Sequence, residues 1–203
     1  MSLADYTALK TAIATDWMHR TDLTSQAADF ITLFESDFNA HMRVRQMEQS
    51  TSLVSTAGYL LHPSNWLGWK DIRGTESGNP YHLEPVTDEI AVARTSGETE
   101  PARYYKVLGL KTYLYPAVNS VTFPTRYWEG VALTSGTNWL LTSYPGAYLY
   151  GSLIQASAFV QNDPRVPLWE AAYEKILDRI RRDNRIASWS GQALKMNPDI
   201  DVQ

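Results

Sequence analysis

The chain has 203 residues, of which 44% are apolar and 20% are charged, and this balance suits one domain or two small ones and excludes a largely disordered chain. The absence of cysteine excludes disulfides and thiolate metal sites, and no apolar run approaches the roughly 20 residues that a membrane-spanning helix needs. The formal net charge is −4, with −7 over residues 1–100 and +3 over residues 101–203, and the acidic half disfavours general nucleic-acid affinity because phosphate contacts need clustered lysine and arginine.

The N-terminal region is predicted to form two helices. Ser2 followed by Asp5 resembles a capping box, and apolar residues at helical spacing carry the first helix to about His19. Asp22 or Thr24 is expected to cap the second helix. The apolar stripe of that helix has the i, i+3, i+4, i+7 spacing of a core-facing surface and comprises Ala27, Phe30, Ile31, Phe34, Phe38 and Met42. No signal peptide is expected, because the first residues lack a basic region followed by an apolar one.

The middle of the chain is predicted to be a sheet region. Between Met47 and Tyr127, runs of Thr, Val, Tyr and Leu are punctuated by Gly, Pro, Asn and Ser, as in strands joined by turns. A hairpin is expected with Gly109 at its turn. A short helix is expected over Thr87–Ala93, followed by a polar loop to Pro101. The predicted strands are Glu48–Val54, Tyr59–His62, Trp69–Gly74, Tyr81–Pro85, Tyr104–Leu108, Lys111–Tyr115 and Val121–Glu129.

Two further helices are predicted between Asn138 and Arg182. The first has almost no charge and must therefore be covered on all sides. Pro145 suits its first turn, and its small residues would let another backbone approach closely. The second is amphipathic and opens at Asp163-Pro164 or at Val166-Pro167. Its C-terminal half is basic, with Lys175, Arg179, Arg181, Arg182 and Arg185. Beyond about Ile186 the tail has no sustained periodicity, and we expect a partner to order it.

Together these elements predict an α+β fold, in which helices from both ends of the chain form one bundle and an antiparallel β-region is inserted between them. The expected organisation is a first bundle part at 1–45, the β-rich region at 46–140, a second bundle part at 141–185 and an extended tail at 186–203.

The sequence carries no catalytic signature. It has no Gly-rich phosphate loop, no G-x-S-x-G elbow and no H-E-x-x-H helix. The four histidines, at 19, 41, 62 and 82, lack metal-ligand spacing. Asp88 and Glu89 lie beside a predicted helix start, where acidic residues are common anyway. We therefore predict no enzyme activity, no cofactor and no metal.

Four features admit more than one interpretation. Trp66 and Trp69, in a predicted Trp-rich loop, could stack on a sugar ring, but a role as a core or interface anchor is favoured. Trp189 could fold back onto its own subunit, but a pocket on a partner is favoured. The basic cluster on the last helix partly complements the helix dipole, and the remaining charges could pair with acidic residues of a neighbour or, less favourably, with DNA phosphates. The charge asymmetry between the halves fits chance composition or complementary faces on neighbouring copies.

An ordered series of structural segments, and no single motif, carries a resemblance to a known family. The segments are Trp17–Thr24, Asp29–Asn39, Arg43–Glu48, Pro101–Tyr105, Leu114–Ala117, Asn138–Leu153 and Asp163–Tyr173. Taken together over about residues 3–182, the chain resembles the head-to-tail connector adaptor proteins of tailed bacteriophages. The tail and the Trp66–Trp69 segment match nothing in that pattern.

The resemblance implies a structural protein of the virion neck, made in the host cytoplasm and not bound to a membrane. It implies a ring of about twelve copies held by heterologous contacts, with one face on the portal protein, the other toward tail or nozzle proteins, and genomic DNA passing through the channel without specific binding. The C-terminal segment would reach the portal through Trp189, Leu194 and Met196. Lys175, Arg179 and Arg182 are the candidate subunit-interface residues.

Two alternatives remain open at the level of sequence. The chain could be a carbohydrate- or surface-binding module that uses Trp66 and Trp69, which predicts a monomer or small oligomer. It could also be a small hydrolase with a serine or carboxylate site, which would require a deep pocket.

Overall fold

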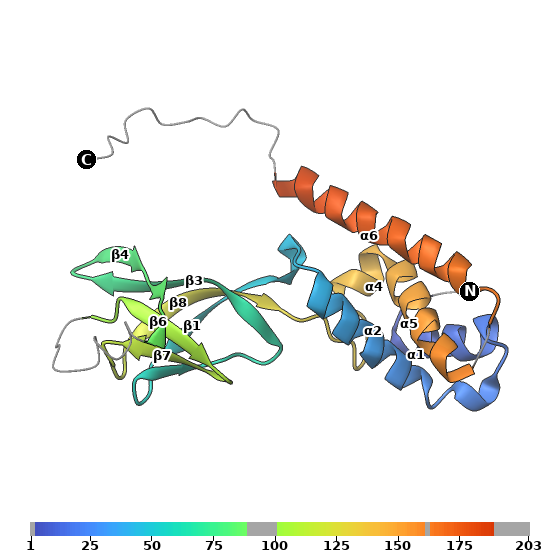
Figure 1. Cartoon of the computed structure of the whole chain (residues 1–203), viewed down its shortest axis with the longest axis horizontal. Helices are drawn as coiled ribbons and strands as arrows, with labels where there is room; N and C mark the ends of the chain where they lie inside the picture. Colours follow the sequence, from blue (N-terminus) through green and yellow to red (C-terminus); the bar gives the residue numbers. More distant parts are fainter. Residues whose placement is uncertain (1–2, 89–100, 161–162, 189–203) are drawn as a thin grey trace.

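A computed structural model describes residues 3–88, 101–160 and 163–188. The strands gather at one end of an elongated molecule and the helices at the other (Figure 1). We call these the β-lobe and the helical lobe. The predicted α+β class is confirmed. The predicted helix at Thr87–Ala93 lies largely outside the described residues, as does the tail from Trp189.

The helical lobe contains segments from both ends of the chain, as predicted. Its buried residues form one continuous apolar core, to which every long helix contributes. The helical segments are α1 (Tyr6–Thr11), η1 (Ala12–Trp17), η2 (Thr21–Leu23), α2 (Ala27–His41), η3 (Arg45–Met47), α4 (Trp139–Ser143), α5 (Pro145–Val160) and α6 (Val166–Ser188).

Two predicted helix starts need correction. Asp5, and not Ser2, caps α1, because its Oδ1 accepts a hydrogen bond of 2.8 Å from the Ala8 amide; Ser2 lies outside the described residues. Neither Asp22 nor Thr24 caps α2, which begins at Ala27. Asp22 is instead in the 3₁₀ turn η2, and the Thr24 hydroxyl donates to the Thr21 carbonyl, 2.8 Å away, so both side chains are engaged locally.

The apolar stripe predicted for α2 is confirmed, since all six of its residues are buried. Helix α5 begins at Pro145 as predicted, and its mostly uncharged surface is covered by α2, α4, η1 and α6. Gly151 brings α5 against α2 so closely that a β-carbon there would lie 2.1 Å from Phe34 Cδ2. The small residues of α5 therefore permit the close approach expected from the sequence.

The β-lobe consists of two four-stranded sheets with the strand orders β1-β8-β3-β4 and β2-β7-β6-β5. A smaller apolar core, which includes Leu60, Ile72, Leu114 and Phe123, lies within it. Most neighbouring strands are antiparallel, as predicted, and among the described strands β5 and β6 form a short parallel pair. The strands are β1 (Glu48–Val54), β2 (Tyr59–Leu61), β3 (Trp66–Glu76), β4 (Asn79–His82), β5 (Glu84–Pro85), β6 (Tyr104–Leu108), β7 (Lys111–Tyr115) and β8 (Thr122–Glu129).

Two strand predictions differ from the structure in an informative way. The segment Tyr81–Pro85 was expected to be one strand, but it breaks at Leu83, because β4 pairs with β3 in one sheet and β5 pairs with β6 in the other. The expected Trp-rich loop is the start of β3, where Trp66 and Gly68 pair with the end of β8. The hairpin between β6 and β7 turns at Gly109, which has a φ of 59°, as predicted.

Candidate functional site

Among the described residues, a cluster of positive charge lines a groove between the C-terminal ends of α2 and α6. The groove has a volume of about 700 Å³. Four arginines and His41 surround it, with Asp178 the only acidic lining residue, whereas the whole chain has a net charge of −4. We call it the basic groove. Its lining residues are His41, Met42, Arg43, Val44, Asp178, Arg181, Arg182, Asn184 and Arg185.

Local structure accounts for only part of this charge. The Arg43 guanidinium donates to the carbonyls of Asn39 and Met42 and so satisfies the end of α2. Arg181 lies 3.1 Å from Asp178, one turn away on α6. Arg185 is in the last turn of α6, where a cation complements the helix dipole. Exposed pairs of this kind contribute little to stability. Because four arginines face one aspartate, the groove keeps a surplus of positive charge that is available to a partner.

Both walls of the basic groove are fixed by hydrogen bonds between segments distant in sequence. The Arg45 amide donates to Asn184 Oδ1, 2.9 Å away, and the Arg45 guanidinium donates to the Ala187 carbonyl at 3.0 Å. Met42 and Val44, which line the groove, are almost completely buried. The arginines therefore project from a preformed support.

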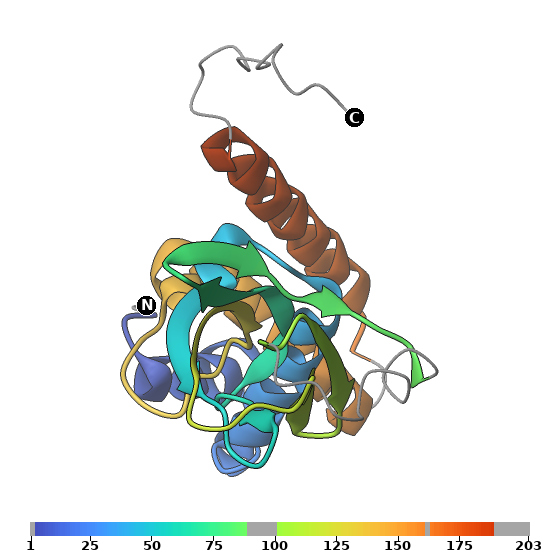
Figure 2. The same cartoon turned by 90° about the vertical axis from the view of Figure 1, so that its left-hand side faces the viewer.

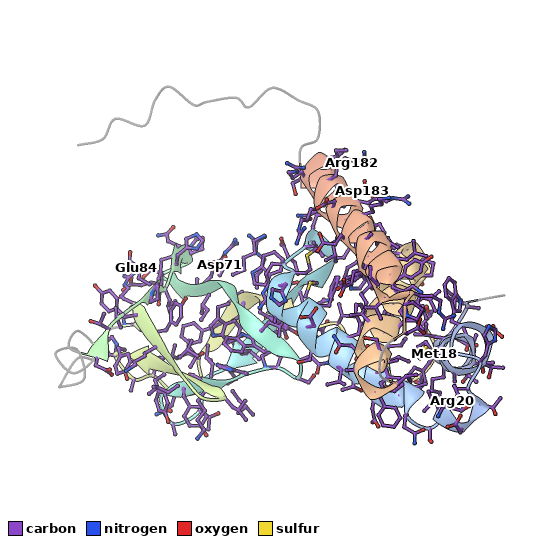
Figure 3. The ribbon with its side chains drawn as sticks, turned by 45° about the vertical axis from the view of Figure 1, so that its right-hand side comes forward. Met18, Arg20, Asp71, Glu84, Arg182 and Asp183 are labelled. Atoms are coloured by element: carbon purple, nitrogen blue, oxygen red, sulfur yellow. The ribbon has the colours of Figure 1, made fainter. Side chains whose placement is uncertain are left out.

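The structure places the three predicted interface residues on α6, all of them exposed. Lys175, Arg179 and Arg182 follow i, i+4 and i+7 spacing, so they share one side of the helix. Arg179 lies 3.6 Å from Asp183, and its guanidinium lies over the Tyr144 ring. Of the three, Arg182 alone lines the groove; Figure 3 shows it with Asp183 at the projecting end of α6, far from Asp71 and Glu84 on the β-lobe. Trp189, Leu194 and Met196 lie outside the described residues.

The Trp66–Trp69 pair is packed against its own lobe. The Trp66 ring lies 3.8 Å from the His62 ring, centroid to centroid. Trp69 Nε1 donates to the buried Thr112 hydroxyl at 2.7 Å, and His62 Nε2 lies 2.8 Å from the same oxygen. Burial lowers the pKa of His62, which favours the neutral ring. These contacts give the pair an anchoring role within the β-lobe.

Sequence reasoning missed a buried polar cluster in the helical lobe. Glu35 Oε1 accepts a hydrogen bond of 2.7 Å from the Tyr148 hydroxyl, which in turn accepts one from Asn138 Nδ2. Burial raises the pKa of Glu35 and also that of Tyr148. Asn39 holds the linker after β8, because its Nδ2 donates to the Val131 carbonyl and its Oδ1 accepts from the Val131 amide.

A raised carboxyl pKa can mark a catalytic site, but here the partners of Glu35 are the Tyr148 hydroxyl and the backbone of Leu133, and the cluster holds α2, α5 and the segment before α4 together. The signal in the sequence was a glutamate directly after Phe34 in an otherwise apolar stripe.

Within residues 3–88, 101–160 and 163–188, no group of three or more histidine and acidic side chains is arranged to bind a metal ion. In the same part of the chain, none of the helices combines the length and the apolarity required to cross a bilayer.

The family model described as SU10 adaptor protein matches residues 4–195, which is nearly the whole chain. No curated protein matches the chain.

Proposed function

We propose, from the premise that the chain belongs to the SU10 adaptor protein family, that it forms a ring beneath the portal and joins the portal to tail components. This is a family of phage head–tail adaptors, so the protein is a structural component of a phage virion and interacts with other virion components. It is a family of structural adaptors, which is not an enzyme class. The family match over residues 4–195 is the observation that carries the proposal.

The proposed ring contains about twelve copies, each of which uses one face to meet a different face of the next copy. Lys175, Arg179 and Arg182 supply one of these faces. This assignment is supported by their exposure along one side of α6, which lies across the bundle and projects beyond it (Figures 1 and 2). Cationic rows of this kind favour acidic surfaces and accelerate association.

The proposed portal contact lies in the C-terminal segment, with Trp189, Leu194 and Met196 as its anchors. Since α6 continues to Ser188, this segment starts from the projecting end of the helix, directly beside the basic groove. The groove would receive acidic side chains of the portal or of a neighbouring copy. Tail or nozzle proteins would bind the opposite face of the ring, and the net acidity of the chain would let DNA pass without being held.

The direct test is electron microscopy of virion necks that carry a labelled copy of the protein. The label is expected as a ring between portal and tail, and its absence from the neck would refute the proposal.

A second experiment tests the role of the tail. Deletion of residues 189–203 leaves α6 and the apolar core of the helical lobe intact, so we expect unchanged thermal unfolding of the protein and loss of portal binding. As a control, Arg20→Glu changes an exposed arginine at the other end of the bundle, whose ion-pair partner among the described residues is Asp22 at 2.7 Å, and this variant should bind the portal normally. Unchanged portal affinity after the deletion would refute the tail assignment.

A further inference from the structure

The β-lobe has four sheet edges, and only one of them is unprotected among the described residues. Native proteins protect edge strands by making them short or by placing proline or lysine on them, because an open edge pairs with other chains. Strand β2 has three residues, β4 has four and includes Pro80, and β5 has two and includes Pro85. Strand β1 has seven residues, of which Gln49–Val54 include neither proline nor charge.

The backbone of β1 is regular and faces outward at alternate residues. All seven residues pair with β8 without a register shift, and the Ser55 amide extends this ladder by donating to the Val121 carbonyl, 2.9 Å away. Since residues of an antiparallel strand alternate between bonded and non-bonded positions, the N–H and C=O groups of Ser50 and Ser52 point away from β8. Both residues are exposed.

A shallow polar hollow of about 350 Å³ lies on the sheet surface beside this edge. Ser50 pairs with Arg126 on β8, so the small serine side chain leaves the guanidinium accessible from the edge. Arg126 has no ion-pair partner among the described residues, whereas the neighbouring Asp71 is already held by Arg73 at 2.5 Å and by His82 at 2.6 Å. The hollow can therefore accept an acidic side chain from outside.

From these observations we propose that β1 is a docking edge for an extended segment of another virion protein. That segment adds a strand alongside β1 by pairing with the main-chain groups of Ser50 and Ser52, and it places an acidic side chain near Arg126. The inference rests on the virion role of the protein, and the choice of occupant rests also on the proposed ring.

A second copy of this chain is a poorer occupant. The other edge of the same sheet, β4, offers only four residues, one of which is Pro80 with no amide hydrogen. Pairing of β1 with β1 would close a two-fold dimer, which does not extend into the proposed ring of head-to-tail contacts. A partner strand from a different protein meets neither restriction.

The test compares amide hydrogen exchange over Glu48–Val54 in the purified protein and in intact virions. In the virion, exchange at Ser50 and Ser52 should slow by about 100-fold or more, because these amides become hydrogen bonded. Unchanged exchange would overturn the proposal. Slow exchange already present in the purified protein, together with a dimeric mass, would identify the occupant as a second copy and overturn the assignment to another protein.

Substitutions provide an independent arm. Ser50→Pro removes an amide that β8 does not use, so far-UV circular dichroism and the melting temperature should stay close to wild type, while incorporation into virions falls by about tenfold or more. Ser50→Thr keeps the amide and should be incorporated normally. If Ser50→Pro fails to fold, Ser52→Lys places a charge at the same edge with the backbone intact. Arg126→Glu should also reduce incorporation. Normal incorporation of a folded edge variant would refute strand addition.

Discussion

The contact between Gly151 on α5 and Phe34 on α2 predicts a large effect from a single methyl group. A β-carbon at Gly151 would lie 2.1 Å from Phe34 Cδ2. The Phe34 ring is 1% exposed and is held between Tyr148 and Tyr173, with centroids at 5.0 and 6.0 Å. A shift of this ring would disturb its contacts with both tyrosines. Overpacking a core costs about 1–3 kcal/mol, and a separation this short favours the upper end. Helix propensity returns about 1 kcal/mol for Gly→Ala, so Gly151→Ala should lower the free energy of unfolding by about 2 kcal/mol.

Gly146→Ala, in the same helix, is the matched control. Its β-carbon would lie 2.8 Å from Ile176 Cδ1, the flexible end of a side chain that can shift. We expect a change within about 1 kcal/mol. Urea denaturation followed by tryptophan fluorescence gives the free energy of unfolding of both variants. In thermal unfolding, the melting temperature of Gly151→Ala should fall by about 4–8 °C. Equal stability of the two variants, or a gain for Gly151→Ala, would show that the α2–α5 contact does not limit packing.

Three further predictions concern buried and half-buried polar groups. Burial raises the pKa of Glu35 above its ordinary 4.5, so the folded state binds that proton more tightly than the unfolded chain, and the associated stability is lost as pH rises through the raised value. Wild type should therefore lose stability relative to Glu35→Gln from about pH 4.5 upward in urea titrations. A pH-independent difference in the free energy of unfolding between the two proteins would contradict this. Thr112→Val removes the hydroxyl that accepts from Trp69 Nε1 and should lower the free energy of unfolding by about 1–3 kcal/mol in thermal unfolding. Its control, Thr122→Val at the exposed start of β8, should change stability by less than about 0.5 kcal/mol. Equal effects of the two substitutions would argue against a stabilising Trp69–Thr112 hydrogen bond. Asn39→Ala removes both hydrogen bonds to Val131 and should cost about 2 kcal/mol by urea denaturation, and a loss below about 0.5 kcal/mol would show that the linker is held by other contacts.

Local patterns in the sequence determined which segments become helices and strands. The bounds of β1, β6 and β7 follow directly from runs of strand-forming residues between turn residues, and Gly109 marks the hairpin because it accepts a positive φ. The stripe on α2 identified the core face of that helix, since helical periodicity is a property of neighbouring residues. An ordered series of such segments was enough to indicate the phage adaptor family.

Tertiary structure decided which elements meet. Residues 81–85 read as one strand, yet Leu83 divides two strands that belong to different sheets, because pairing partners far along the chain set the hydrogen bonds. The basic cluster read as one feature, but the rotation of α6 splits it between an outer side, with Lys175 and Arg179, and the basic groove, with Arg181 and Arg185. The exposed edge at β1 and the burial of Glu35 depend on what lies beside them in space, which spacing along a single chain does not encode.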